Sequence, residues 1–291
     1  MIPVIFDCDN TMGIYGKDVD DGLALLYLLG SENIDLIAIT TTFGNSTLEM
    51  VHPNTQRILR ELGREDIPLY KGAETPQNRS SEAAKALVDM VDRRPHELTI
   101  LATGSVSNLM GAYDIDPLFF KKVKHIVMMG GIEYPLLVNG LPMKELNFAS
   151  DPEAICIVLE QCHSTSIITG HVCLDAVFSH DTYRNMAKSI KQEMYDFIKK
   201  ETEHWITFIG TIYNMNGFCN WDAVAAAYID HPDLFDVVQK QIGHKKEDLE
   251  TGLLIEDPSN GNTITLPLKI KNVDILNDIL ISAWANVKLG K

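Results

Sequence analysis

The 291-residue sequence predicts an α/β protein built on an open, mostly parallel, Rossmann-like sheet flanked by helices. Short β-branched runs alternate with longer stretches of helical periodicity, which is typical of repeated strand–helix–strand units. Most of these runs are apolar without alternation, as expected of strands that are buried on both faces. Because no Gly/Ser-rich linker, repeat or low-complexity tract divides the chain, we expect a single domain over residues 1–291.

The elements follow one another regularly. We expect strands at 4–6, 36–40, 67–70, 98–101, 125–128 and 166–168. Helices are expected near 20–29, 47–62, 81–93, 105–113 and 151–162. The last of these follows Ser150-Asp151-Pro152-Glu153, a capping box with Pro in the first turn. The segment 180–230 has helical periodicity and forms the predicted helical C-terminal flank over the site, whereas 258–267 is predicted to be a hairpin.

Composition excludes several functional classes. The chain carries 25 Lys and Arg against 40 Asp and Glu, a net charge of −15, which repels phosphate backbones and anionic lipid. We therefore expect no nucleic-acid or membrane partner. Apolar runs reach at most seven residues, whereas a spanning helix needs about 20. The apolar N-terminus resembles a first strand rather than a signal peptide, and five cysteines without a Cys-x-x-Cys pair suit free thiols, so we expect a cytoplasmic protein.

Polar residues gather directly after the predicted strands. In open α/β sheets the ligand lies beyond the carboxyl ends of the strands, so these positions are the first candidates for a site. They are Asp7, Asp9 and Asn10 after the first strand, Thr41, Gly44 and Asn45 after the second, Thr103 and Gly104 after the fourth, and Gly130 and Gly131 after the fifth.

A dense acidic cluster begins at the first strand. Five carboxylates occur within fifteen residues: Asp7, Asp9, Asp18, Asp20 and Asp21. Left unpaired they would repel one another, and a hard divalent cation would neutralise them. Ca²⁺ takes 6 to 8 oxygens in irregular geometry, whereas Mg²⁺ requires an octahedron, so the ligand chemistry favours calcium. The alternative is that Asp20 and Asp21 simply occupy the first turn of a helix, where carboxylates suit the macrodipole.

Two further polar groups are candidates for the same site. Asp222 follows Asn220 and Trp221 and precedes an apolar helix. It is either a ligand or a helix N-terminal residue beside an aromatic core side chain. Glu145 and Asn147 precede the capped helix at 151, where loop polarity alone also explains them. Asn45 after Gly44 is likewise either functional or a turn residue.

Together these motifs resemble the inosine-uridine-type nucleoside hydrolases. The matching pieces occur in the family's order and at near-family spacing over most of the chain. They are Asp7-Cys8-Asp9 with Asp20-Asp21, Thr40-Thr41 through Gly44-Asn45, Ala102-Thr103-Gly104 before Ser107-Asn108, Met129-Gly130-Gly131, Glu145-Leu146-Asn147 with Asp151-Pro152-Glu153-Ala154, and Trp221-Asp222.

The resemblance implies a role for each matching residue in the cleavage of the ribosyl C–N bond. Asp9 would deprotonate a calcium-bound water that attacks the anomeric carbon, and Asp7 would orient the metal shell. The implied Ca²⁺ ligands are Asp9, Asp21, the carbonyl of Thr103, and Asp222. The implied ribose-binding residues are Asp20, Asn45, Asn139, Glu145 and Asn147. Carboxylates near the sugar would stabilise the oxocarbenium character of the transition state.

The chain departs from the family pattern in three places. The short turn within the Asp-x-Asp-Pro-Gly-x-Asp-Asp motif is replaced by the longer segment 10–19, and a His-Gly pair is absent after the third strand. Trp221 occupies the position where the family often has His, a leaving-group acid. This substitution resembles the purine-preferring branch, so we expect Trp221 to stack on the base and inosine and guanosine to be favoured. Tyr213, Trp205 and His204 are candidates for the opposite wall of the base pocket, although core packing explains each equally well.

Two other functional classes fit parts of the sequence. Asp7-Cys8-Asp9-Asn10-Thr11 matches the Asp-x-Asp-x-Thr signature of haloacid-dehalogenase-type phosphatases, but no later Lys and acidic pair complete that set. A non-catalytic nucleoside- or ribose-binding protein could use the same calcium pocket. The resemblance also implies a homo-oligomer, either a dimer or a tetramer.

Overall fold

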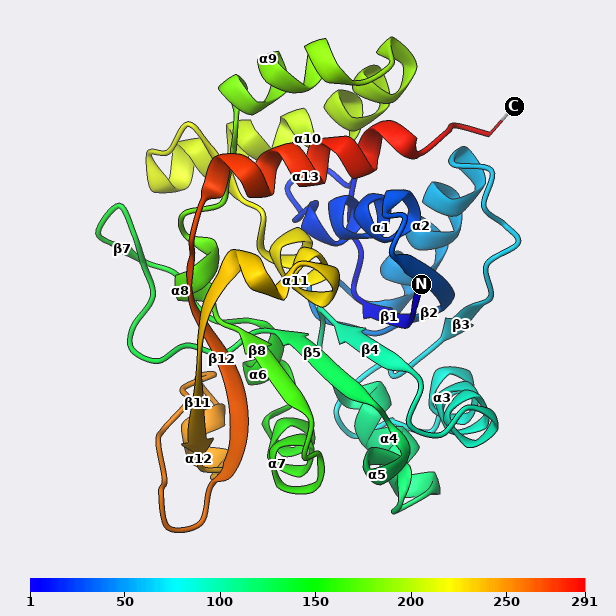
Figure 1. The fold of residues 1–291 in the computed structure, drawn as a ribbon, viewed down its shortest axis with the longest axis vertical. Helices are drawn as coiled ribbons and strands as arrows, with labels where there is room; N and C mark the ends of the chain where they lie inside the picture. The colour runs from blue at the N-terminus through cyan, green and yellow to red at the C-terminus, as the bar shows by residue number, and fades with distance from the viewer. Residues whose placement is uncertain (291) are drawn as a thin grey trace.

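The computed structural model describes residues 1–290, and its centre is an eight-stranded sheet with helices on both faces (Figure 1). Seven strands run parallel and one edge strand, β11, is antiparallel, so the predicted fold class is confirmed. From one edge to the other the strands are β11 (Phe235–Ile242), β12 (Asn262–Ile270), β8 (Thr165–Ile168), β5 (His125–Met129), β4 (Thr99–Ala102), β1 (Ile2–Cys8), β2 (Ile34–Thr41) and β3 (Leu69–Lys71).

The central strands are apolar throughout because each face meets its own hydrophobic core. In β1, Val4 and Phe6 belong to the core on one face and Ile5 to the core on the other. In β4, Leu101 and Ile100 are divided in the same way. Alternation along a strand therefore separates two apolar environments rather than core from water, which is why the sequence shows unbroken apolar runs.

Helices cover both faces of the sheet in Figure 1. One layer contains α1 (Asp20–Gly30), α2 (Leu48–Glu61), α11 (Trp221–Asp230) and α13 (Val273–Asn286), and the other contains α3 (Glu82–Arg93), α4 (Ser107–Ile115), α5 (Phe119–Lys122), α7 (Pro152–Gln161) and α12 (Lys246–Leu249). The remaining elements are shorter or peripheral: α6 (Asn147–Ser150), α8 (Gly170–Cys173), α9 (His180–Ser189), α10 (Gln192–Tyr213), the 3₁₀ turn 232–234, and the two-stranded pairs β6 (Leu137–Val138) with β7 (Leu141–Pro142) and β9 (Val177–Ser179) with β10 (Gly217–Cys219). No helix within residues 1–290 combines the length and apolarity needed to cross a bilayer.

Two local predictions were incomplete or wrong. The segment 180–230 is helical except for β10, which pairs with β9. The hairpin predicted at 258–267 was wrong: these residues form a turn and most of β12. The antiparallel partner of β12 is β11, which lies before the long connection 243–261. A local pattern could not reveal this pairing, because the two strands are too far apart in sequence to be joined by a short turn.

The strand order creates a switch point at β1. The chain leaves β1 for β2 and β3 on one side and returns to β4 on the other. Connections therefore diverge at the carboxyl ends of β1 and β4, which leaves a crevice there. Asp9 follows β1 and Thr103 follows β4, so the topology alone brings these two predicted residues to one place.

The long helix α10 is tied to the body of the molecule by an ion pair whose carboxylate is buried. Glu201 is 3% exposed and lies 2.8 Å from Nη2 of Arg57 on α2. Burial alone would raise the pKa of Glu201, but hydrogen bonds from Arg57 and Lys200 outweigh burial and lower it. The same Nη2 donates to the carbonyl of Met12 at 2.9 Å. One guanidinium thus joins α2, α10 and the segment 10–19.

Candidate active site

A cavity of about 300 Å³ opens at the switch point, between the strand ends and α10. Its two ends differ in chemistry. We call the polar end, beside the strands, the acidic end; it is lined by Asp18, Asp20, Asn45, Thr103, Glu145, Asn147 and Asp222. We call the other the apolar end; it is lined mainly by Ile132, Leu136, Met143, Trp205, Phe208, Ile209, Ile212, Tyr213, Met215, Phe218 and Trp221.

The floor of the acidic end is a cluster of buried carboxylates. Asp20, Asp21 and Asp222 place one oxygen each within 4.8 Å of the others, and the carboxyl group of Asp9 contacts that of Asp21. Burial, reinforced by the neighbouring carboxylates, raises the pKa of Asp21 and Asp222 well above the usual range and that of Asp20 to about 7. Such crowding is unfavourable for ionised groups, and a divalent cation among these oxygens would relieve it. The donor set therefore fits a hard metal ion.

Asp9 is fully buried, and both of its oxygens accept hydrogen bonds from one residue. The backbone N–H of Asn45 donates to Oδ2 at 2.5 Å and the side-chain amide donates to Oδ1 at 3.2 Å. The loop after β2 can approach this closely only because position 44 is glycine; a Cβ there would collide with Oδ2 of Asp9. The loop therefore fixes the direction in which the Asp9 carboxylate points.

Thr103 links the metal-ligand candidates to the strand ends. Its hydroxyl donates to Oδ1 of Asp21 at 2.7 Å. Its carbonyl, the predicted metal ligand, accepts from the amide of Asn147 at 2.9 Å, and the same amide donates to the carbonyl of Met129 at 3.0 Å. Asn147 therefore holds the ends of β4 and β5 together at the cavity wall.

Asp7 is fully buried beside this cluster and does not line the cavity. Its Oδ1 accepts from the hydroxyl of Thr40 at 2.5 Å and from the amide of Asn108 at 2.6 Å. Burial raises the pKa of Asp7 to about 7, and the two hydrogen bonds only partly offset this effect. The side chain joins β1 to β2 and α4, so Asp7 supports the strand end that carries Asp9.

Glu145 and Asn139, two of the predicted ribose-binding residues, make hydrogen bonds that the sequence did not predict. Glu145 lines the cavity, but its carboxylate also accepts hydrogen bonds from the backbone N–H groups of Gly131, Phe148 and Ala149. The structure does not bring Asn139 to the cavity. Its exposed amide donates instead to the carbonyls of Tyr213 and Asn214 at 2.9 Å, at the C-terminal end of α10.

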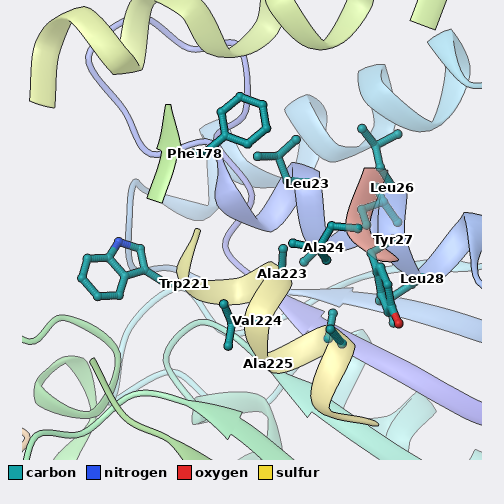
Figure 2. Packing of buried hydrophobic residues seen from close by; sticks show 14 of the residues in the cluster. Leu23, Ala24, Leu26, Tyr27, Leu28, Phe178, Trp221, Ala223, Val224 and Ala225 are labelled. Atoms are coloured by element: carbon teal, nitrogen blue, oxygen red, sulfur yellow. The ribbon is translucent and has the colours of Figure 1, made fainter. Parts of the chain in front are cut away.

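One stripe of α10 forms part of the apolar end, beside side chains from several other segments. Its cavity residues follow helical spacing, and they include the predicted Trp205 and Tyr213. Trp221 faces the stripe from the start of α11, and Figure 2 shows its indole directed away from the packed side chains of α1 and α11. His204 does not line the cavity; its ring lies 5.9 Å from that of Tyr15, between centroids.

Comparison with known proteins identifies the family. The model of the inosine-uridine preferring nucleoside hydrolases matches residues 4–283. The chain belongs to this family. It is 28% identical to the pyrimidine-specific ribonucleoside hydrolase RihA of Citrobacter koseri, over 83% of each chain, and 28% identical to a probable uridine nucleosidase 2 of Arabidopsis thaliana, over 75% of this chain and 76% of that one.

Solved structures share the fold of this nucleoside hydrolase. The plant enzyme PpNRh1 superposes with a TM-score of 0.84 at 21% identity, covering 97% of this chain and 98% of that one. The purine-preferring ribonucleoside hydrolase of Gardnerella vaginalis superposes with a TM-score of 0.83 at 22% identity and the same coverage. Membership of the family makes the protein a ribonucleoside N-glycosidase and removes the phosphatase alternative.

The nucleoside hydrolase fold also brings one carboxylate to the cavity that had no assigned role. Asp18 lines the acidic end beside Asp20, and burial followed by the charge of Asp20 raises the pKa of Asp18 well above its usual range. The sequence places Asp18 in the acidic cluster, but only the path of the segment 10–19 determines where its side chain lies. The hydroxyl of Thr11 fixes that path by donating to the carbonyl of Asp18 at 2.8 Å.

Proposed function

We propose that this nucleoside hydrolase cleaves purine ribonucleosides to free base and ribose with the help of one Ca²⁺. The observation that carries the proposal is the joining of two chemically opposite ends in one cavity: buried carboxylates suited to a cation and a sugar, and an indole-lined apolar wall suited to a base. A ribonucleoside has the same division between hydroxyls and a planar ring.

The proposed ligands of the cation are the carboxylates of Asp9, Asp21 and Asp222 and the carbonyl of Thr103. The close approach of the acidic side chains and the irregular mixture of carboxylate and carbonyl oxygens suit Ca²⁺ better than Mg²⁺. When bound, the ion would lower the pKa of a coordinated water, so that hydroxide is available near neutral pH.

Asp9 is proposed as the general base. It would accept a proton from the attacking water as the water oxygen bonds to the anomeric carbon of ribose. The bond between that carbon and the base nitrogen then breaks, and its electron pair leaves with the base, which takes up a proton from solvent. The ribose hydroxyls would form hydrogen bonds with Asp20, Asn45, Glu145 and Asn147. The nearby carboxylates would stabilise positive charge on the sugar.

Trp221 supports a preference for purines. Among the cavity-lining residues of the part of the chain that the structure describes there is no histidine to protonate the leaving base, whereas Trp221 and Trp205 both line the apolar end. A fused purine ring offers a larger stacking area than a pyrimidine and is the better leaving group. The sequence relatives carry pyrimidine names, since RihA is called pyrimidine-specific and the Arabidopsis protein a probable uridine nucleosidase, whereas the purine-preferring Gardnerella enzyme is a match of fold.

The test is ribose release from inosine, guanosine, adenosine, uridine and cytidine, assayed as reducing sugar with and without chelator. We expect inosine and guanosine to be cleaved faster than uridine, and chelation to abolish release. A wild-type protein faster on uridine would overturn the purine preference. A thermal shift with inosine but no ribose would identify a binding protein instead.

A further inference from the structure

We propose that Lys17 is a positioning residue that holds Asn45 against Asp9. The inference rests on the proposed function, because it assigns Lys17 a role in aligning the proposed base. Lys17 belongs to the segment 10–19, which replaces a short turn of the family pattern, and it is half-buried. Its Nζ donates to the backbone carbonyl of Asn45 at 2.9 Å.

The segment 10–19 is a fixed platform for this contact. Two consecutive turns give it shape: the N–H of Ile14 donates to the carbonyl of Thr11 at 2.9 Å, and the N–H of Lys17 donates to the carbonyl of Ile14 at 3.1 Å. Two side chains of α2 also hold the segment: the amide of Asn54 donates to the carbonyl of Met12 at 3.1 Å, and Arg57 donates to the same carbonyl. Because these bonds restrain the backbone on both sides, Lys17 extends from a restrained position.

The loop that Lys17 contacts is restrained around Asn45: the Ser105 hydroxyl donates to the carbonyl of Phe43 at 2.9 Å, and the N–H of Gly44 donates to the carbonyl of Ser46 at 3.1 Å. Neither bond involves Asn45 itself, whose carbonyl accepts from Lys17. Residues 43–46 form a bend that is partly exposed, whereas Asp9 beneath them is fully buried. Both hydrogen bonds to the Asp9 carboxylate come from Asn45 in this bend. Position 44 is a glycine, whose backbone is conformationally permissive. A donor on the opposite side of Asn45 therefore restricts the loop residue that sets the orientation of Asp9.

The role follows from this chain of contacts. Lys17 holds the Asn45 carbonyl, and Asn45 presents its N–H and amide to both oxygens of Asp9. The ammonium group touches neither the sugar nor the reacting atoms, so its effect on turnover is indirect. A small error in the placement of a reacting group can lower the reaction rate by up to roughly a hundredfold.

The experiment compares Lys17→Met, which keeps the aliphatic stem and removes the donor, with Lys17→Arg, which restores a donor. Lys85→Met on the exposed face of α3 is the control. We expect Lys17→Met to lower kcat on inosine by on the order of tenfold, with an unchanged melting temperature in Ca²⁺. Lys17→Arg should regain most of the lost activity, and Lys85→Met should resemble wild type.

A double mutant separates positioning from general destabilisation. If Lys17 acts through Asn45, the loss caused by Lys17→Met should shrink in an Asn45→Ala background, because one of the two aligned donors is already absent. Wild-type kcat in Lys17→Met, or a loss that follows the melting temperature and is not restored by Arg, would overturn the inference alone. A wild-type protein that releases ribose from no nucleoside would overturn the proposed function and this inference with it.

Discussion

The acidic and apolar ends of the cavity are built in different ways. The metal-ligand candidates at the acidic end are buried, and they come from strand ends and helix starts that hydrogen bonds join to one another. The apolar end combines side chains from several segments, including Trp221, with one stripe of α10, part of which meets solvent: Phe208 is 38% exposed and Ile212 is 45% exposed. The comparison indicates that the proposed bond-breaking groups are shared among many elements, whereas a large part of the proposed base-binding wall lies on one helix, so that part can be varied separately.

Removing the proposed metal ion should have the largest effect on activity and stability, because the crowded carboxylates of the acidic end would then repel one another. We expect chelation to abolish ribose release and to lower the melting temperature, and added Ca²⁺ to restore both. Elemental analysis of the purified protein should find about one calcium per chain. Full activity in chelator together with no bound calcium would refute the metal assignment.

The destabilisation of chelated protein should depend on pH in a defined direction. Burial raises the pKa of Asp7 and Asp20 to about 7, above the value of 3.8 for an unburied Asp. A carboxyl group whose pKa is raised on folding binds its proton more tightly in the folded state than in the unfolded state. Its contribution to the free energy of unfolding is therefore complete below pH about 4 and is lost as the pH rises through about 7. The melting temperature in chelator should therefore fall between pH 5 and 8, and the increase caused by Ca²⁺ should grow. Asp20→Asn should flatten this dependence.

Asp9→Asn should have the second-largest effect. The substitution keeps the shape of the side chain but removes a carboxylate that can accept a proton, so kcat should fall on the order of 10² to 10⁴-fold with a smaller change in KM. Asp35→Asn, at an exposed position of β2, is the matched control. Near-normal turnover in calcium-loaded Asp9→Asn would rule out Asp9 as the base.

Trp221→Ala tests the apolar end of the cavity. Loss of one aromatic stack should raise the barrier for inosine by about 1 to 3 kcal/mol, with a smaller effect on uridine. The measurement is the ratio of kcat/KM for the two nucleosides. If Trp221 were only a core anchor, the mutant would lose stability while this ratio stayed the same.

Phe208→Ala should have the smallest effect. The ring is partly exposed at the cavity edge, so its removal should cost about 1 kcal/mol of binding and raise KM several-fold without changing kcat. Thr207→Ala, at the exposed position of α10 directly before Phe208, serves as the control. An unchanged KM for every nucleoside would show that substrate does not reach this part of the helix.

Much of the acidic end could be predicted from sequence because strand ends converge by topology. Asp9 and Thr103 follow two short apolar runs, and parallel strands bring such positions to one edge of the sheet. Asp20, Asp21 and Asp222 begin two helices that pack against each other, which explains how residues 200 positions apart form one cluster.

The remaining features depend on contacts that no local pattern encodes. Asn139 follows the expected spacing before Glu145, yet the hairpin that carries it directs its amide to the end of α10. The stripe on α10 has the periodicity of any amphipathic helix, so its sequence does not show whether it faces a core or a cavity. Lys17 lies in a segment without secondary structure, and only its contact with Asn45 distinguishes it from a surface lysine.

The ion pair between Glu201 and Arg57 has a practical consequence for protein engineering. Glu201 secures α10 one turn before Trp205, and the cavity-facing positions all follow that anchor. The anchor's partner lies on α2 rather than among the carboxylates. A combinatorial library confined to Trp205, Phe208, Ile209, Ile212 and Tyr213 would thus vary base selection on a helix whose attachment is left intact. Selection for growth on chosen nucleosides would then sample new specificities at little risk to the hydrolytic step.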